Sequence, residues 1–218
     1  MAPLMKGATP WNMEYSIHHV PPTMKREILT VFPQVNLDKL LIVPTCQHAA
    51  VDLVKTGENV ENEKDRLLEQ FLAWAKTVCD QLTVDGHWSD YIDPCSGLPV
   101  CLRYGYFLKL TGPGGCHFLV KVVGFLTVPT GAQRNDFCIA HVPSCGISQM
   151  IHTELNTVYP EVPALSILMG YQTANAGCCK VLLHPVWGSA VYPASLFTEA
   201  PQDTLLAAIT TANDLQVE

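Results

Sequence analysis

The stretch ENEKDRLLEQFLAWAKTVCDQL, from Glu61 to Leu82, decides the fold class. Its large apolar residues recur at helical spacing, and smaller or apolar neighbours widen the stripe that they form. The stripe comprises Leu67, Phe71, Trp74, Val78 and Leu82, widened by Leu68, Leu72, Ala75 and Cys79. Acidic residues crowd its start, where the helix dipole favours negative charge. The spacing predicts a long amphipathic helix that buries this stripe in a core.

The segments on either side of this helix are predicted mainly as strands. Before it lie Trp11–Val20, a short helix Met24–Phe32 with Thr23 as its N-cap, and the apolar run Lys39–Val43, which ends at Pro44 and is typical of a central buried strand. After it lie strands over Leu165–Tyr171, Cys178–His184 and Gly188–Phe197, then a helix over Thr204–Asp214 capped by Asp203. Pro193 makes the last strand an edge or bulged strand. The mixture predicts an α+β fold with a mostly antiparallel sheet flanked by helices.

Composition limits the classes of function. The chain has 218 residues, of which 48% are hydrophobic and 15% charged, enough for one domain with a packed core. A net charge of −7 argues against a nucleic-acid partner, and no apolar run is long enough to predict a membrane helix. The N-terminus has no secretory signal and no clear mitochondrial leader, so we expect a cytoplasmic protein with residues 1–12 flexible. Most of the nine cysteines are then expected as reduced, packed thiols.

The segment GHWSDYIDPCSGLP, from Gly86 to Pro99, combines turn-forming residues with large side chains. One interpretation is an ordered loop in which Asp90 and Asp93 cap turns. The other makes the loop part of a binding surface, with Trp88 and Tyr91 exposed to a partner. The composition alone leaves both open.

A second candidate lies in residues 101–150, which are rich in cysteine, glycine and proline. Strand-like runs occur at Arg103–Leu110 and His117–Val128. A zinc site is one hypothesis for the cysteines and histidines there, which are Cys116, His117, Cys138, His141 and Cys145. Their spacing lacks the short regular ligand pairs of a zinc knuckle, which disfavours that hypothesis.

The sharpest motif is GCCKVLLHPVWG, from Gly177 to Gly188. Its adjacent cysteines have neither disulfide geometry nor C-x-x-C spacing. Strand alternation predicts Cys179, Val181 and Leu183 on the core face, and Cys178, Lys180 and His184 on the outer face. Lys180 would favour a Cys178 thiolate, which can act as a nucleophile, a redox thiol or a ligand for a soft metal centre. His184 lies too far along the strand to be its base, and two merely packed cysteines are the alternative.

At these residues the chain resembles the CblD family of cobalamin-trafficking proteins, named for the type D form of combined methylmalonic aciduria and homocystinuria. The resemblance rests on five blocks that follow in order along roughly half of the chain. They are FPQV with KLLIV (Phe32–Val43), LLEQFLAWAKTVCDQL, GHWSDYIDPCSGL, GCCKVLLHPVWG and SLFTEAPQD.

The resemblance implies a single domain over residues 1–218 with a degenerate nitroreductase-like fold that binds no flavin and catalyses no reaction. It implies a chaperone that forms a heterodimer with the type C cobalamin-processing protein and binds no cofactor alone. Cobalamin would be shared with that partner, and Cys178 would donate its sulfur to the cobalt, with Cys179 and Lys180 beside it. The complex would deliver cobalamin toward methionine synthase or methylmalonyl-CoA mutase. Partner contacts are assigned to Trp88, Tyr91, Asp93, His184 and Trp187.

Two departures from the family pattern shape these expectations. The chain begins almost at the folded domain, which favours the cytosolic, methionine-synthase branch. Residues 101–150 have no counterpart in the resemblance, so they are interpreted as an insertion or as a gene-model error such as translated intron. Two other hypotheses stay open: a flavin-dependent nitroreductase-like oxidoreductase, and a redox or zinc protein that uses the surplus cysteines.

Overall fold

The computed structural model describes residues 2–10, 12–101, 105–111, 117–123, 147–150, 157–177 and 179–215. The chain divides into two compact units, each with its own sheet. The first unit comprises Met1–Val100 and Leu155–Glu218, and the second comprises Cys101–Glu154. The second unit nearly coincides with the segment 101–150 that the family resemblance leaves unmatched. Whether that segment is an insertion stays a prediction.

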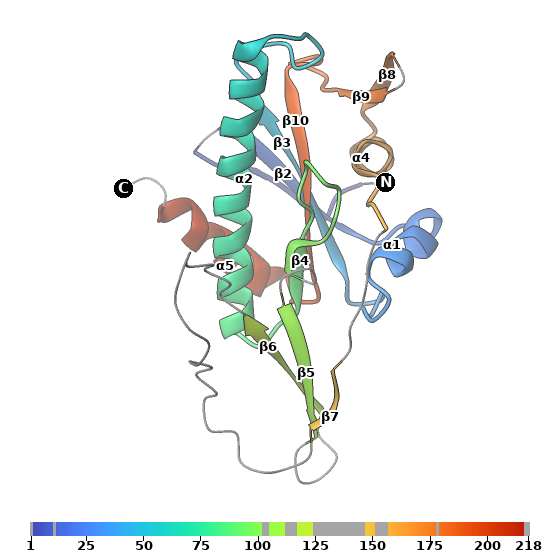
Figure 1. Ribbon diagram of the computed structural model, residues 1–218, viewed down its shortest axis with the longest axis vertical. Coiled ribbons are helices and arrows are strands. Elements are labelled where there is room, and N and C mark those ends of the chain that lie inside the picture. Colours follow the sequence, from blue (N-terminus) through green and yellow to red (C-terminus); the bar gives the residue numbers. More distant parts are fainter. Residues whose placement is uncertain are drawn as a thin grey trace, which may run out of the picture. The chain divides into compact units, whose positions relative to one another are not determined.

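The first unit is built on a five-stranded antiparallel sheet of order β1-β2-β3-β10-β4 (Figure 1). Its strands are β1 Met5–Ala8, β2 Met13–His19, β3 Leu41–His48, β10 Val191–Thr198 and β4 Ser89–Tyr91. The central strand β3 is buried from Leu41 to Gln47, which confirms the prediction of a central buried strand. The α+β class with a mostly antiparallel sheet is confirmed as well.

The predicted end of the central strand at Pro44 is wrong, because β3 continues to His48. Pro44 pairs with Ser195 of β10 in unbroken register. On the β2 side, the ladder is interrupted between the pairs Tyr15–Thr45 and His18–Ile42. Proline has no N–H to donate, so it is accommodated where the β2 ladder has a gap.

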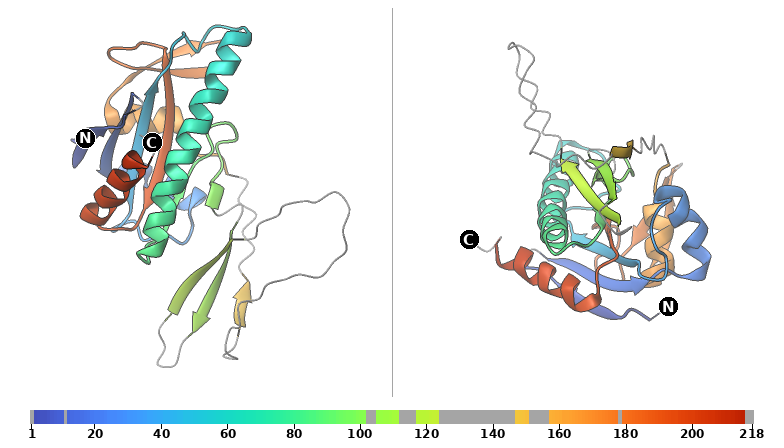
Figure 2. Two further views of the ribbon diagram at one scale, coloured as in Figure 1. Left: turned by 90° about the vertical axis from the view of Figure 1, so that its left-hand side faces the viewer. Right: turned by 90° about the horizontal axis from the view of Figure 1, so that it is seen from below.

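Helices cover both faces of this sheet (Figures 1 and 2). On one face lie α2 Glu58–Val84 and α5 Gln202–Asp214, and Tyr15 of β2 contacts Trp74 of α2 there, with ring centroids 6.4 Å apart. On the other face lie η1 Pro22–Met24, α1 Lys25–Val31 and α4 Glu161–Met169. Alternate residues of β2, β3 and β10 therefore meet different helices, as the pleat requires. None of the described helices is both long and apolar enough to traverse a bilayer.

The long helix forms as its periodicity predicts. The central stripe is buried together with Ala75 and Cys79, whereas Leu68 and Leu72 at its edges are half-buried. The helix runs from Glu58 to Val84, so it extends beyond the predicted stretch Glu61–Leu82 at both ends. Trp74 Nε1 donates a hydrogen bond to Asn213 Oδ1 at 3.1 Å, which joins α2 to α5.

The strand predicted over Leu165–Tyr171 is wrong, because Glu161–Met169 form the helix α4. The run is apolar on every side, so its periodicity distinguishes a strand poorly from a buried helix. Pro163 lies in the first turn, where a missing N–H costs little. Gly170 ends the helix with φ of +70°, the left-handed conformation that glycine adopts without strain.

Two predicted helix N-caps are wrong, and the strand predicted as an edge strand is one over only part of its length. Thr23 lies inside η1, and the Asp203 side chain does not cap α5, whose N-cap is Pro201. β10 is not bulged, since it pairs with β3 in unbroken register, and it is an edge strand only over the residues that β4 does not reach. β4 reaches only Leu196–Thr198, so β10 has a single neighbouring strand at Pro193. That local edge explains why the proline is tolerated.

The second unit contains a three-stranded antiparallel sheet of order β6-β5-β7. Its strands are β5 Gly105–Thr111, β6 His117–Val123 and β7 Ile147–Met150. β5 and β6 pair in continuous register from Gly105–Val123 to Thr111–His117. The β5–β7 ladder shifts register between Leu108 and Leu110. Both strand-like runs predicted in this segment are confirmed as strands over these ranges.

Candidate functional site

The GCC motif lies at the tip of a two-stranded antiparallel hairpin, formed by β8 Gln172–Ala176 and β9 Cys179–Leu183. Ala176 pairs with Cys179, so the connection between the strands is only two residues long. Gly177 is the first of them, with φ of +63°, as short hairpin connections commonly require. Cys178 is the second, and it lies outside the described residues.

The predicted division of β9 into a core face and an outer face is wrong. Cys179, assigned to the core, is exposed, and so is the neighbouring Lys180. Leu182 and His184, both on the predicted outer face, are the buried residues, at 3% and 4% exposure. From Val181 to His184 burial alternates with the opposite parity to the prediction, because Leu182 packs on Cys46 and Leu165 while Val181 and Leu183 are only half-buried. At the tip, both faces are exposed.

The base of the hairpin is held by a small apolar cluster under α4. Leu182 packs there with Cys46 of β3, Leu165 of α4 and Val191 of β10. Met169, Tyr171, Val162 and Trp187 pack against this cluster. Ser166 Oγ donates a hydrogen bond to the carbonyl of Tyr171 at 2.9 Å, which ties α4 to the start of β8. The hairpin therefore has an anchored base and an exposed Cys–Lys tip.

The second half of the motif, HPVWG, is a tight turn that immediately follows β9. The main-chain groups of His184 and Gly188 exchange two hydrogen bonds, of 2.8 and 2.9 Å. The His184 ring closes the same turn from inside, because Nδ1 accepts from the N–H groups of Val186 and Trp187, at 3.2 Å each. A backbone N–H can only donate, so Nδ1 carries no proton and Nε2 carries it.

That Nε2 proton points to Glu14 of β2, whose Oε2 lies 3.2 Å away. The ring itself is enclosed by aromatic groups. Trp187 stacks on it with centroids 3.8 Å apart, and Tyr171 meets it edge-on at 5.0 Å. The outer face of Trp187 is in turn covered by His48, at 4.8 Å. His184 and Trp187, assigned to partner binding, are thus a buried turn residue and an indole covered on both faces.

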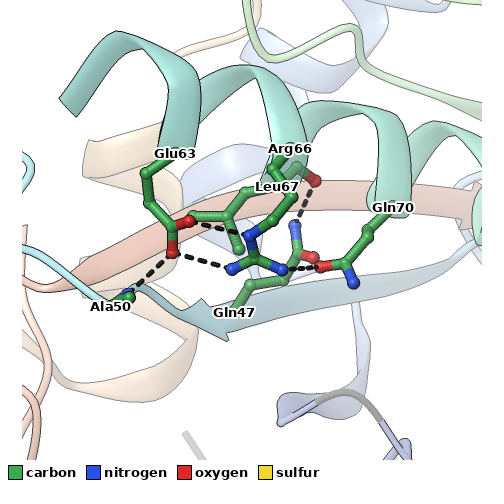
Figure 3. Close-up of polar contacts among 6 residues, drawn as sticks. All are labelled: Gln47, Ala50, Glu63, Arg66, Leu67 and Gln70. Carbon is green, nitrogen blue, oxygen red and sulfur yellow. Dashed lines mark hydrogen bonds and ion pairs between the residues drawn. The ribbon is translucent and has the colours of Figure 1, made fainter. Parts of the chain in front are cut away.

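The end of β3 connects this turn to α2. Ala49 N donates to the carbonyl of Ala190, and Ser189 Oγ donates to Asp52 Oδ1 at 2.7 Å, which lowers the pKa of Asp52. On the α2 side, Ala50 N donates to Glu63 Oε1 at 2.7 Å (Figure 3).

Figure 3 also shows that Arg66 holds the Glu63 carboxylate with two hydrogen bonds, both 2.7 Å. These hydrogen bonds lower the pKa of Glu63, so its charged form is favoured. In the same close-up, Gln47 Nε2 donates to the carbonyl of Leu67 at 2.8 Å. The acidic start of α2, predicted only to complement the helix dipole, therefore also fixes the end of β3.

The predicted loop Gly86–Pro99 contains the strand β4 and a turn organised by Asp93. Asp93 Oδ1 accepts from Cys95 N at 3.0 Å, and its Oδ2 accepts from Ser96 Oγ at 2.6 Å. The predicted turn cap at Asp93 is confirmed. Tyr91 is only 6% exposed and meets Phe71 edge-on, so it does not offer its side chain to a partner. Trp88 is half-buried against Phe32, at 5.4 Å.

One polar cluster on the α4 side was missed by the sequence analysis. Ser195 of β10, fully buried, donates to Glu161 Oε1 at 2.5 Å. Burial raises the pKa of Glu161 to about 7, against the opposing effect of that hydrogen bond. Glu161 Oε2 and the Tyr159 hydroxyl are buried without a hydrogen-bond partner in the part of the chain that the structure describes. Glu14 was missed too, and a contact across 170 positions leaves no local signal.

Metal-binding arrangements are limited in the described parts of the chain, where no three His, Cys, Asp or Glu residues gather closely enough to hold an ion. The hypothetical zinc residues Cys116, Cys138, His141 and Cys145 lie outside the described residues. What the site does offer is an exposed cysteine and lysine on an anchored hairpin. Such a tip can present sulfur to a soft metal centre held by another molecule.

Comparison with known proteins shows which family this chain resembles. The model of the family described as methylmalonic aciduria and homocystinuria type D protein matches residues 6–106. The chain is 28% identical over 192 residues to the cobalamin trafficking protein CblD of Rattus norvegicus and to that of Homo sapiens. The corresponding protein of Gallus gallus is 26% identical over 192 residues. The resemblance to the CblD family is confirmed.

The alignments cover most of this chain but only part of each relative. Each alignment covers 88% of this chain and 48% of the relative, so the chain spans about half the length of the curated relatives that it matches. An aligned span of 192 residues in a chain of 218 necessarily includes residues 27–192. The GCC hairpin and the HPVWG turn therefore lie within it, as does the segment 101–150.

Proposed function

Because this chain resembles the CblD family across the hairpin and the sheet that anchors it, we propose that it is a non-enzymatic cobalamin trafficking chaperone. It binds the type C cobalamin-processing protein and supplies a cysteine thiolate to the cobalt of the partner-bound cobalamin. The observation that carries the proposal is the exposed Cys179–Lys180 tip on a hairpin whose base is buried. The names of the relatives support the cobalamin role.

The geometry of the tip suits an interprotein metal ligand. A sulfur donor must reach a cobalt that another protein encloses, and a narrow hairpin can enter a pocket that a flat sheet cannot. A lysine beside the cysteines favours the thiolate, the form that binds metals. Cobalt in a corrinoid is a metal centre for which a thiolate is a suitable ligand.

We assign the cobalt ligand to Cys178, the first cysteine of the pair, with Cys179 and Lys180 as its neighbours in the complex. The exposure of Cys179 makes it the alternative ligand, so the two must be tested separately. Delivery toward methionine synthase, with methylmalonyl-CoA mutase as the other destination, belongs to the same proposal. So does a nitroreductase-like origin of the fold, without flavin.

The test mixes the purified protein with the type C partner loaded with cobalamin and follows the absorbance spectrum. We expect a thiolate–cobalamin spectrum with the wild type and its loss in Cys178→Ala. Cys179→Ala should retain it, and Cys95→Ala is the matched control, since Cys95 is also exposed but lies in the Asp93 turn. Loss with Cys179→Ala alone would move the ligand to the second sulfur.

Two outcomes would contradict the proposal as a whole. One is a wild-type protein that leaves the spectrum of the loaded partner unchanged and does not co-elute with it. The other is purified protein that carries stoichiometric flavin and reduces a substrate, which would support the oxidoreductase alternative. Metal analysis of the reduced protein tests the hypothesis of a redox or zinc protein that uses the surplus cysteines. Stoichiometric zinc would support that hypothesis.

A further inference from the structure

The geometry points to His184 and Glu14 as a positioning pair that sets the orientation of the GCC hairpin, an inference that rests on the proposed function. His184 stands directly after β9, at the end opposite the cysteines. Its side chain is 2% exposed, whereas that of Glu14 is 44% exposed. The pair joins the hairpin to β2, a strand to which the hairpin has no ladder in the described sheets.

Each ring nitrogen of His184 has a separate task. Nδ1 accepts from two backbone N–H groups and so shapes the turn from Pro185 to Gly188. Nε2 donates to the Glu14 carboxylate and so ties that turn to the main sheet. Only the neutral tautomer with its proton on Nε2 satisfies all three contacts at once. Stacking on Trp187 and the edge contact with Tyr171 restrict rotation of the ring.

This arrangement has a consequence for the tip. Two-stranded hairpins are at best marginally stable alone, so the direction of β8–β9 depends on what holds its base. The apolar cluster around Leu182 resists withdrawal of the strand but does not define an angle, because apolar packing is not directional. A hydrogen bond to a charged group is directional. The Ser166–Tyr171 hydrogen bond restrains the start of β8, and the His184–Glu14 contact supplies the corresponding angular restraint after β9, the cysteine-bearing strand.

Side-chain mimics separate the two tasks. In His184→Asn, Oδ1 takes the place of Nδ1 and keeps the turn, but nothing reaches Glu14. In His184→Gln, the amide nitrogen takes the place of Nε2 and keeps the donor to Glu14, but the turn loses its acceptor. Glu14→Ala removes the same contact from the other side. Glu14→Ala and His184→Asn remove the same contact. The double variant Glu14→Ala/His184→Asn should therefore behave like each single variant.

The first readout needs no cobalamin. By hydrogen exchange, the Val186 and Trp187 amides should stay protected in His184→Asn and lose at least tenfold protection in His184→Gln. A long-range 1H–15N correlation spectrum of the wild type should show His184 protonated at Nε2 only. A proton on Nδ1, or equal protection in both variants, would overturn the inference even if the proposed function held.

The second readout is the rate at which the thiolate–cobalamin spectrum forms with the loaded partner. Glu14→Ala and His184→Asn should each slow it about tenfold, the factor that about 1.4 kcal/mol produces. His18→Gln is the control, since His18 is also buried in β2 but bonds Ser16 and not the hairpin. Wild-type rates in both variants would overturn the inference, provided that the wild type forms the complex. If the wild type forms none, the proposed function fails, and hydrogen exchange alone decides the positioning role.

Discussion

The hydroxyl of Ser195 donates to the carboxylate of Glu161 across the boundary between the sheet and α4, at 2.5 Å. This contact is the polar part of an otherwise apolar interface, in which Leu165 of α4 packs on Cys46 and Val191. A carboxyl group buried there with one hydrogen-bonded oxygen is held more easily as the neutral acid. The pH dependence of stability should reveal it.

The first prediction concerns Glu161→Gln. The folded-state pKa of Glu161 is raised to about 7, so the folded protein binds this proton more tightly than the unfolded chain does. Its stabilising contribution is complete below the unfolded pKa near 4.3 and is lost as the pH rises through about 7. Between these limits the wild type should lose roughly 3 kcal/mol relative to Glu161→Gln. Urea unfolding from pH 4 to pH 8 measures this difference.

The matched control for that experiment is Glu69→Gln, on the exposed side of α2. It makes the same chemical change at a surface position away from Ser195. Parallel profiles for wild type and Glu161→Gln would show that folding does not raise the pKa of Glu161.

The second prediction concerns His18, for which stability changes with pH in the opposite direction. Burial lowers the pKa of His18 to about 4, with the positive charge of Lys6 acting in the same direction. The neutral ring is therefore the folded form, and stability falls as the pH drops from about 6.5 toward 4 because the unfolded chain takes up the proton first. His18→Gln should shift the midpoint of acid unfolding, followed by circular dichroism, to lower pH. A midpoint equal to or above that of the wild type would contradict this expectation.

The third prediction tests the contact between α2 and α5. Trp74 is fully buried, so Trp74→Ala should cost about 3–5 kcal/mol of unfolding free energy. Trp74→Phe keeps much of the volume but loses the hydrogen bond to Asn213, and Asn213→Ala loses it from the other side. Guanidinium unfolding of Asn213→Ala should show a loss of about 1 kcal/mol. If the unfolding free energy of Asn213→Ala equals that of the wild type, the hydrogen bond makes no net contribution, and Trp74 stabilises the fold through its buried volume alone.

The fourth prediction compares Gly97 in the Asp93 turn with Gly86, which follows the end of α2 and serves as the reference. Gly97 has φ of +68°, and a Cβ there would lie 2.5 Å from Val158 Cγ1. Gly86 has φ of +80° but open space around it. Gly86→Ala should cost roughly 1–2 kcal/mol for backbone strain alone, and Gly97→Ala about 1 kcal/mol more.

Thermal unfolding of both glycine variants measures that difference. Adding Val158→Ala to Gly97→Ala should remove the excess, since it removes the clashing methyl group. An excess that persists in the double variant would assign the cost to the turn itself, whose Gly97 N–H bonds the carbonyl of Asp93.

Much of the architecture could be predicted from local pattern. Glu58–Val84 has a clear helical period over many turns, and Leu41–Val43 is an apolar run of strand length, so both elements followed from the sequence. Glu161–Met169 lacks a clear apolar face, and its capping residue Gly170 was included in the predicted strand Leu165–Tyr171 and was not recognised as a helix end.

The site was predictable in composition but not in geometry. The residue types of the GCC–HPVWG stretch made it the candidate site, whereas strand alternation failed to predict that Cys179 is exposed. The Glu14 contact joins residues 170 positions apart, and no alternation or spacing rule reaches that far. Burial near a hairpin tip and pairing across a sheet are tertiary properties, so they required the structure.

The Trp187 indole, lying between the imidazoles of His48 and His184, gives the chain an internal optical probe. Indole emission depends on what lies against the ring, so emission from this residue should respond to any tilt of the hairpin that moves Trp187 relative to these two imidazoles. Replacing the other three tryptophans by phenylalanine would isolate that emission. Arrival of a partner at the cysteine tip could then be timed from light emitted in the turn that follows the other end of β9.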